Sequence, residues 1–231
     1  MLKSYVAFDV ETTGLDPAEN EVIEIGALKV REGKVVERFM EFIKPSCPIP
    51  PKITGLTGIC DSMVASARTR DRVMPDFLEF CRDDVLIGHN ILFDYGFIKM
   101  GAKALGYDFE REGIDTLKIA RAVHRELPSK SLGVLCDHYQ IENAAAHRAY
   151  HDALATAKLY QTLAHYYEET EPLVFRPAPL IYAGKESPKA TKKQLDLLTR
   201  LTKQRKLAQD WDPETLTVAE ASKRIERILS R

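Results

Sequence analysis

The sequence predicts an α/β fold that opens with an antiparallel three-stranded meander and ends in a small helical appendage. Within residues 5–43, three runs rich in β-branched and aromatic residues follow one another, separated only by short turns. Residues 85–105 have the pattern of a buried apolar strand that runs into a helix, a combination typical of α/β proteins. At residue 169 the pattern breaks in a proline-rich stretch, and a basic helical tail follows.

The meander is predicted from alternation and turn chemistry. Residues 5–8 (Tyr-Val-Ala-Phe) suit a pleated, half-buried surface. Residues 15–20 contain the Asp, Pro and Asn of a turn, and a second strand is expected over 22–30. A short turn at 31–34 then leads into a third strand over 35–43.

After the meander, strands and helices are expected to alternate. Residues 45–59 hold four prolines and two glycines and are predicted to be a loop, whereas residues 61–81 show helical spacing. Residues 85–88 are wholly apolar, as in a buried strand, and residues 93–105 predict a helix that Gly106 ends.

Three more helices are expected before the break. A strand end at residues 113–116 supplies Asp115 or Thr116 as the cap of a helix that runs through Arg125. Residues 131–139 predict a short helix, and the most regular helix of the domain starts near Asp152.

The chain is expected to divide into a domain at residues 1–168, a proline-rich linker at 169–190 and a basic two-helix module at 191–231. In the module, Thr191 is predicted to cap the first helix, and the second is expected over residues 218–230. Two helices this short bury little surface and should depend on each other or on a partner.

Composition narrows the class of protein. Hydrophobic residues make up 45% of the chain and charged residues 29%, as in a soluble globular protein. The four cysteines form no CxxC pair, which argues against a zinc site and a disulfide scaffold and favours a reduced, cytoplasmic compartment. No signal peptide and no membrane span are expected, since no apolar run approaches the ~18 residues that a span needs.

Charge is divided unevenly along the chain. Residues 191–231 hold ten Lys and Arg against six Asp and Glu and so carry +4, which leaves −5 on residues 1–190. This division is compatible with metal ions in the first part and contact with a polyanion in the second.

Four carboxylates lie where predicted elements begin or end. Asp9 and Glu11 are two residues apart in a strand and therefore project from one face. Such a pair is either a charged face exposed to solvent or a metal site. A metal site is considered because close like charges raise each other's pKa unless a cation lies between them. Asp94 and Asp152 start helices, although Asp94 could simply cap its helix. Four hard oxygen ligands suit Mg²⁺ or Mn²⁺ and do not suit zinc.

His147 adds a proton acceptor to this set. It lies in a loop five residues before Asp152, and an unperturbed histidine has a pKa of ~6.5, which suits a general base. Two metal ions roughly 3.5–4 Å apart are the recurrent solution for phosphodiester cleavage.

Together these residues resemble the DEDDh superfamily of exonucleases. Phe-Asp-Val-Glu-Thr-Thr-Gly at 8–14, His-Asn with Phe-Asp at 89–94, and His-x4-Asp at 147–152 match its three motifs in order and spacing. The resemblance covers roughly residues 3–168 and is to the epsilon-type proofreading exonucleases of bacterial DNA polymerase III. The sister DEDDy branch would need a tyrosine where this chain has Arg148. The resemblance implies a ribonuclease H-like mixed sheet flanked by helices.

The resemblance also implies roles for the motif residues. Asp9, Glu11 and Asp152 would bind the catalytic metal ion, and Asp9 with Asp94 would hold a second, both ions being Mg²⁺ or Mn²⁺. His147 would deprotonate the water that attacks the terminal phosphodiester.

Contacts to the terminal nucleotide are implied as well. The loop after the first motif offers Thr12, Thr13 and Leu15. Thr57 stands where some relatives use a histidine near the 3′ end, and Asn90 is implied to be an orienting group.

The tail resembles, loosely, small two-helix modules appended to bacterial proteins. Residues 185–206 hold eight basic residues and two acids, enough for sequence-independent contact with phosphates, although a solvated helix face explains the same pattern. The candidate contacts are Lys192, Lys193, Arg200 and Lys203.

The function predicted is that of a metal-dependent 3′→5′ exonuclease. It would release nucleoside 5′-monophosphates from single-stranded or frayed DNA ends in proofreading or repair, alone or with a DNA polymerase. A 3′-trimming ribonuclease of the same fold is the alternative enzyme, because nothing in the sequence reads the 2′-hydroxyl. A non-catalytic nucleic-acid-binding or polymerase-docking module would be expected to have lost a carboxylate, and all four are present.

Overall fold

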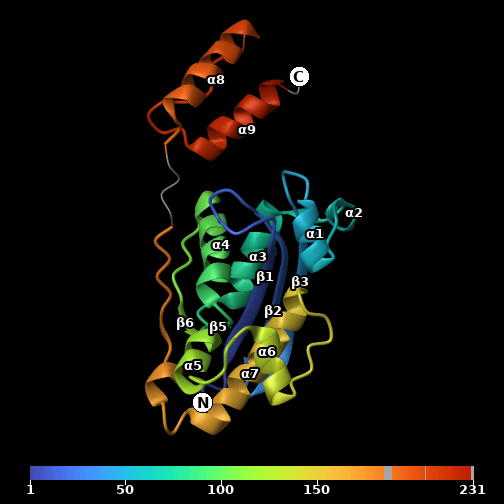
Figure 1. The fold of residues 1–231 in the computed structure, drawn as a ribbon, viewed down its shortest axis with the longest axis vertical. Helices are drawn as coiled ribbons and strands as arrows, with labels where there is room; N and C mark the ends of the chain where they lie inside the picture. The colour runs from blue at the N-terminus through green and yellow to red at the C-terminus, as the bar shows by residue number, and fades with distance from the viewer. Residues whose placement is uncertain (185–188, 206, 230–231) are drawn as a thin grey trace. The chain divides into compact units, whose positions relative to one another are not determined.

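A computed structural model describes residues 1–184, 189–205 and 207–229 (Figure 1). The chain forms two compact units, Met1–Tyr182 and Ala183–Arg231. The first unit is built on a seven-stranded sheet of order β4-β3-β2-β1-β5-β6-β7. Its strands are β1 (Tyr5–Thr12), β2 (Val22–Arg31), β3 (Lys34–Lys44), β4 (Arg68–Thr69), β5 (Leu86–Gly88), β6 (Glu112–Asp115) and β7 (Ala178–Pro179).

The sheet is mixed, as the sequence predicts. Strands β1, β2 and β3 pair antiparallel as a meander, whereas β5 pairs parallel to β1 and β6 parallel to β5. The helices are α1 (Pro51–Thr57), α2 (Asp61–Val64), α3 (Arg70–Cys81), α4 (Ile91–Ala104), α5 (Thr116–Val123), α6 (Leu132–Tyr139), α7 (Ala149–Tyr167) and a 3-10 helix at Pro172–Phe175.

The two faces of β1 belong to two different cores. Val6, Phe8 and Val10 pack in the cluster that contains residues of α3 and α4, and Tyr5 and Ala7 pack in the cluster that contains residues of α7. Side chains alternate along a strand, so the acids at positions 9 and 11 project from the α7 face. The alternation of β1 therefore directs these two carboxylates toward the helix that carries Asp152.

Helix α7 lies close against the meander. A Cβ atom at Gly26 of β2 would lie 1.9 Å from the backbone nitrogen of Tyr150, in the first turn of α7. Only glycine permits this approach, because any side chain would meet the backbone of the helix. The N-terminal turn of α7 is thus held next to the strands that carry the acids.

One predicted loop contains a helix. The sequence assigns residues 45–59 to a loop, but α1 begins at Pro51, where proline is tolerated in the first turn. Gly58 follows its last residue as the C-cap, in the left-handed conformation (φ 72°). Ile53 of α1 packs against a small core that includes Ile49 and Ile59. Pro51 and Gly58, two of the residues that predict a loop, therefore mark the two ends of a short helix.

The first unit extends beyond residue 168. Phe175 and Leu180 are buried in its two cores, and the ring of Tyr182 lies against Gly96. The predicted linker at 169–190 thus includes a segment up to Tyr182 that packs on the first unit. Its prolines exclude a continuous helix but do not prevent burial. Residues 185–188 of this linker lie outside the described residues.

The second unit contains α8 (Lys192–Gln204) and α9 (Val218–Leu229). Thr191 caps α8 in a capping box with Gln194, as predicted. Leu198, Leu216 and Ala221 form the buried centre of this small core with Ala190. The predicted end of the second helix at Ser230 lies outside the described residues. Among the helices in the described ranges, none is long and apolar enough to cross a lipid bilayer.

Candidate metal centre

Asp94 joins the two acids of β1 through the backbone between them. Its Oδ1 accepts a hydrogen bond of 3.0 Å from the backbone N–H of Val10, which lies between Asp9 and Glu11. Asp94 is only 3% exposed. It lies inside the first turn of α4, whose N-cap residue is Asn90, so it does not serve as the cap. Helix α4 thus brings a third carboxylate to the same point on β1.

Asp152 lies in the first turn of α7 and organises the loop before that helix. Its Oδ1 accepts from Asn143 Nδ2 at 2.7 Å, and its Oδ2 accepts from the backbone N–H of His147 at 2.8 Å. The side chain is 8% exposed. Since both oxygens hold the loop, the conformation of the loop and the orientation of the carboxylate depend on each other.

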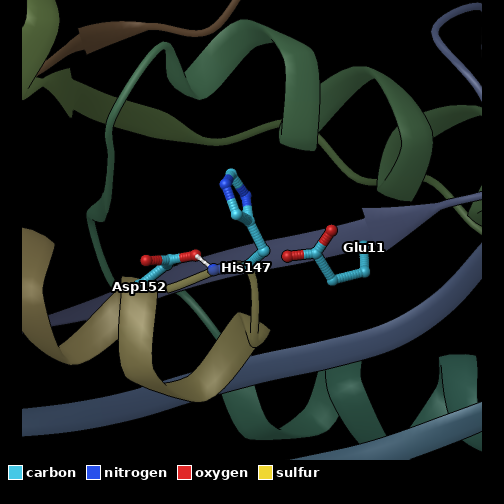
Figure 2. Close-up of side chains that lie close together, drawn as sticks. All are labelled: Glu11, His147 and Asp152. Carbon is cyan, nitrogen blue, oxygen red and sulfur yellow. Dashed lines mark hydrogen bonds between the residues drawn. The ribbon is translucent and has the colours of Figure 1, made fainter. Parts of the chain in front are cut away.

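Glu11, His147 and Asp152 form a group able to hold a metal ion. One possible ligand atom from each residue lies within 4.8 Å of the other two. Figure 2 shows Glu11 and Asp152 on either side of His147, with the imidazole standing between them. The histidine is exposed, whereas Asp152 is buried. The group therefore presents an accessible imidazole beside acids that come from other elements.

The carboxylates of this cluster repel one another, and a bound cation would relieve that repulsion. Burial, followed by repulsion from Asp94 and Asp152, raises the pKa of Asp9 well above its ordinary value. Burial and the charges of Asp152 and Glu24 raise the pKa of Glu11 to about 8. Burial is also the main reason that the pKa of Asp94 rises to about 8. A divalent ion among these groups would reverse the repulsion, and oxygen donors with one imidazole suit such an ion. The residues present therefore fit divalent metal ions.

Metal binding to this centre is expected to strengthen as the pH rises through about 8, because Glu11 and Asp94 have pKa values near 8 in the metal-free fold and must lose protons to bind a cation. Calorimetric titration with Mn²⁺ at neutral pH, in buffers that differ in ionisation enthalpy, should report proton release. An affinity for Mn²⁺ that is the same below and above this pH would contradict the expectation.

Two further residues, Glu24 and Asn143, hold the loop before α7, and for Glu24 the sequence favours a structural role at a strand edge. Glu24 of β2 accepts from the guanidinium of Arg148, at 2.8 Å for Nη2, and from the backbone N–H of Ala149 at 3.1 Å. Glu24 could be recognised in the sequence as an acid on an apolar strand. Nothing local pairs it with an arginine 124 residues away. Asn143, which holds Asp152, has no sequence signal either.

The threonines of the first motif are occupied within their own turn. Thr12 Oγ1 donates to the carbonyl of Gly14 at 2.6 Å, and Thr13 Oγ1 accepts from the N–H of Glu21 at 2.9 Å. Both side chains are buried, whereas Leu15 is 83% exposed. Of these three predicted nucleotide contacts, Leu15 is therefore the one that presents a free side chain.

Thr57 and Asn90 also differ in exposure, since the first is buried and the second is exposed. Thr57 is buried at the end of α1, where its hydroxyl donates to the Ile53 carbonyl at 3.0 Å. Asn90 is exposed at the end of β5, in the left-handed conformation with φ 65°. Its backbone N–H donates to Asp115 Oδ1 at 2.9 Å, and this bond ties the end of β5 to the end of β6.

The candidate residues of the tail lie on α8 of the second unit. All four carry exposed side chains, and they are Lys192, Lys193, Arg200 and Lys203. The leucines of the same helix, Leu198 and Leu201, are buried. The helix thus has a basic face opposite its packed face.

Comparison with known sequences finds one family model, described as an exonuclease, that matches residues 6–160. The chain is 43% identical over 156 residues to the PolC-type DNA polymerase III of Caldanaerobacter subterraneus subsp. tengcongensis, covering 68% of this chain and 11% of that protein. It is 39% identical over 158 residues to the PolC-type polymerase of Thermotoga maritima, covering 68% and 12%. The chain thus spans about a tenth of the length of the curated relatives it matches.

Solved structures share the fold. Exonuclease X in complex with 5′ overhanging duplex DNA matches with a TM-score of 0.58 and 24% identity, covering 71% of this chain and 92% of that one. E. coli exonuclease I in complex with a dA16 oligonucleotide matches with a TM-score of 0.65 and 20% identity, covering 75% and 42%. These likenesses confirm the predicted mixed sheet flanked by helices.

Proposed function

The chain belongs to the exonuclease family, and we propose on that basis that it is a divalent-metal-dependent 3′→5′ exonuclease acting on single-stranded or frayed DNA ends. The family match agrees with the resemblance of the three motifs to the DEDDh branch. The product would be nucleoside 5′-monophosphates. The observation that carries the proposal is the group of Glu11, His147 and Asp152, whose possible ligand atoms lie within 4.8 Å of one another.

DNA is the proposed substrate because the relatives and structural neighbours are named as DNA polymerases or as complexes with DNA. The curated relatives are named as DNA polymerases, and two solved structures of the same fold are described as complexes with DNA. Since the matched segment is a small part of each polymerase, proofreading beside a polymerase is the proposed role. RNA ends are the alternative substrate, and digestion of matched DNA and RNA strands distinguishes the two.

Each acid of the cluster has a proposed task. Asp9, Glu11 and Asp152 would hold one Mg²⁺ or Mn²⁺ ion, and Asp9 with Asp94 would hold another. When bound, these ions supply charge neutralisation for the acids and polarise the terminal phosphate. Asp152 also positions the imidazole, through its bond to the backbone N–H of His147.

His147 is proposed as the general base. Its exposed ring takes a proton from the water that attacks the terminal phosphorus. The P–O bond to the 3′ oxygen of the penultimate nucleotide breaks, and that oxygen leaves and acquires a proton. The terminal nucleotide departs as a 5′-monophosphate.

The terminal nucleotide is proposed to contact exposed groups beside the acids. Leu15 offers an apolar surface for a base, and Asn90 offers an amide at the end of β5. Thr12, Thr13 and Thr57 use their hydroxyls internally, so we propose that they contribute by shaping the backbone that the nucleotide meets.

Matched DNA and RNA strands labelled at the 5′ end test this proposal. With Mg²⁺ or Mn²⁺, the DNA strand should shorten stepwise from its 3′ end, and EDTA should stop the reaction. Shortening of the RNA strand alone would establish the ribonuclease alternative. Activity that survives Asp9→Ala would contradict the proposal, because that change removes an acid assigned to both ions.

The basic face of α8 is proposed to bind the nucleic-acid backbone. Replacing Lys192, Lys193, Arg200 and Lys203 together with glutamine should weaken binding of long single strands. The slope of log K against log salt should fall by about 0.7 for each lost phosphate contact. Binding is measured in EDTA so that the strands are not degraded. An unchanged affinity and slope would contradict this role and leave the face to a protein partner.

A further inference from the structure

We propose that Arg148 is a positioning residue, which anchors the loop before α7 to Glu24 and so holds the His147 imidazole beside Glu11 and Asp152. This inference rests on the proposed exonuclease function and deepens it. It assigns a catalytic consequence to an ion pair that neither the motifs nor the chemistry of metal binding requires.

The ion pair has a fixed geometry. The Nε of Arg148 donates to both oxygens of Glu24, at 3.2 and 3.3 Å, and Nη2 donates to Oε1 at 2.8 Å. The backbone N–H of Ala149 donates to Oε2 at 3.1 Å. The Arg148 guanidinium also lies 5.3 Å from the centroid of the Phe42 ring. A planar fork with two sites of contact restrains the arginine in a way that a single point charge does not.

His147 needs such an anchor because of its backbone. It adopts a left-handed conformation, with φ 61°, which costs energy in a residue other than glycine. Among the described residues its ring makes no hydrogen bond, so the backbone on either side aims it. On one side its own N–H is bonded to Asp152. On the other side the next residue is Arg148, held by Glu24.

The pair also ties the histidine loop to β2, beside the strand that carries Glu11. Glu11 and Glu24 are direct partners in the register of β1 and β2, so their side chains project from the same face. Like charges in such a pair repel each other. The guanidinium compensates for this repulsion at Glu24 while it restrains the residue next to His147. One arginine therefore relates the position of the proposed base to β2, the strand paired with the one that carries Glu11.

Loss of an ion pair that only stabilises the fold would lower stability and leave turnover unchanged. Removing an arginine from a part-buried pair leaves the carboxylate without its compensating charge and lowers stability, whether or not the pair lies near the metal centre. Arg31 provides the matched control, because it lies on the same strand as Glu24 and its Nη2 pairs with Asp84 at 2.6 Å. That pair touches none of the residues assigned to the metal centre. Loss of either arginine should lower stability, but only loss of Arg148 should lower turnover.

The experiment compares the full-length wild type with Arg148→Gln, Arg148→Lys, Arg31→Gln and the double variant Glu24→Gln/Arg148→Gln. Turnover on a 5′-labelled single strand is measured at saturating Mn²⁺, with melting curves for each protein. We expect Arg148→Gln to lower kcat about a hundredfold with little change in KM, since a misplaced catalytic group costs that much. Arg148→Lys should recover part of this loss. The double variant should recover the melting temperature but not kcat.

An NMR readout keeps this inference separate from the proposed function. The ring signals of His147, assigned by comparison with His147→Gln, should shift in Arg148→Gln and stay in place in Arg31→Gln. Unshifted His147 signals in Arg148→Gln, or a kcat equal to that of Arg31→Gln, would overturn the anchor. If the wild type cleaves no strand but Arg148→Gln still shifts the His147 signals, the exonuclease function is overturned. The role of Arg148 in positioning His147 would then stand by itself.

Discussion

Asp94→Asn is expected to remove almost all exonuclease activity and, at the same time, to stabilise the metal-free protein. Loss of a metal-holding acid forfeits several kcal/mol of transition-state stabilisation, and each 1.36 kcal/mol is tenfold in rate, so we expect a loss of about 10²–10³-fold. Asparagine keeps an oxygen that can accept the N–H of Val10, so the local structure should survive.

The gain in stability follows from the sign of the pKa shift. Burial raises the pKa of Asp94 from 3.8 to about 8, so the fold favours the protonated acid. The free energy of unfolding of the metal-free protein therefore falls as the pH rises between these two values. Asparagine removes this penalty. Its advantage should be absent below the lower value and fully present above the upper one.

Melting curves in EDTA across this pH range test the stability part. The melting temperature should rise by about 2–4 °C for each kcal/mol of penalty removed. Asp137→Asn, at an exposed position on α6, is the matched control and should change neither melting nor activity. A lower melting temperature for Asp94→Asn at high pH would show that the acid is not strained in the metal-free fold.

His147→Gln is the second change with a large expected effect. A general base contributes about 10²–10⁴-fold to a rate, so kcat should fall by that range. KM should change little, because the exposed ring is assigned to proton transfer and not to holding the strand. The backbone N–H of residue 147 still donates to Asp152 when glutamine replaces the histidine, so the loop should keep this hydrogen bond.

His151→Gln is the matched control for this change, since His151 lies in the first turn of the same helix, next to Asp152. It should retain the kcat of the wild type. Equal losses in both variants would mean that the effect comes from disturbing α7 and would remove the assignment of His147 as the base.

Much of the fold is predictable from local pattern, and particular residues show why. The alternation in β1 predicts Asp9 and Glu11 on one face, in agreement with the two cores that its other residues enter. The cap at Thr191 is likewise local chemistry between residues three positions apart. By contrast, the sequence predicts a loop where α1 lies, because Pro51 and Gly58 are typical of loops, although each also suits a helix end.

The end of the first unit needed tertiary information. Prolines from residue 172 onward predict an interruption, and the long helix ends at Tyr167, before the first of them. Whether the chain then leaves the domain depends on where Phe175 and Leu180 find apolar partners, and both are buried against it. The apolar runs at 173–175 and 180–182, which contain these two residues, are too short to show a periodicity from which burial could be predicted.

By itself, the sequence determined the family of this protein and the set of residues proposed for its chemistry. Four carboxylates at element ends, with a histidine five residues before the last, indicate hard divalent ions and a general base, and motif spacing indicates the exonuclease family. Only the tertiary structure decided how the histidine is held. Arg148 meets Glu24 across 124 residues, and Asn143 meets Asp152 from a loop. Such partners are set by the packing of a helix on a sheet, and no local period encodes them.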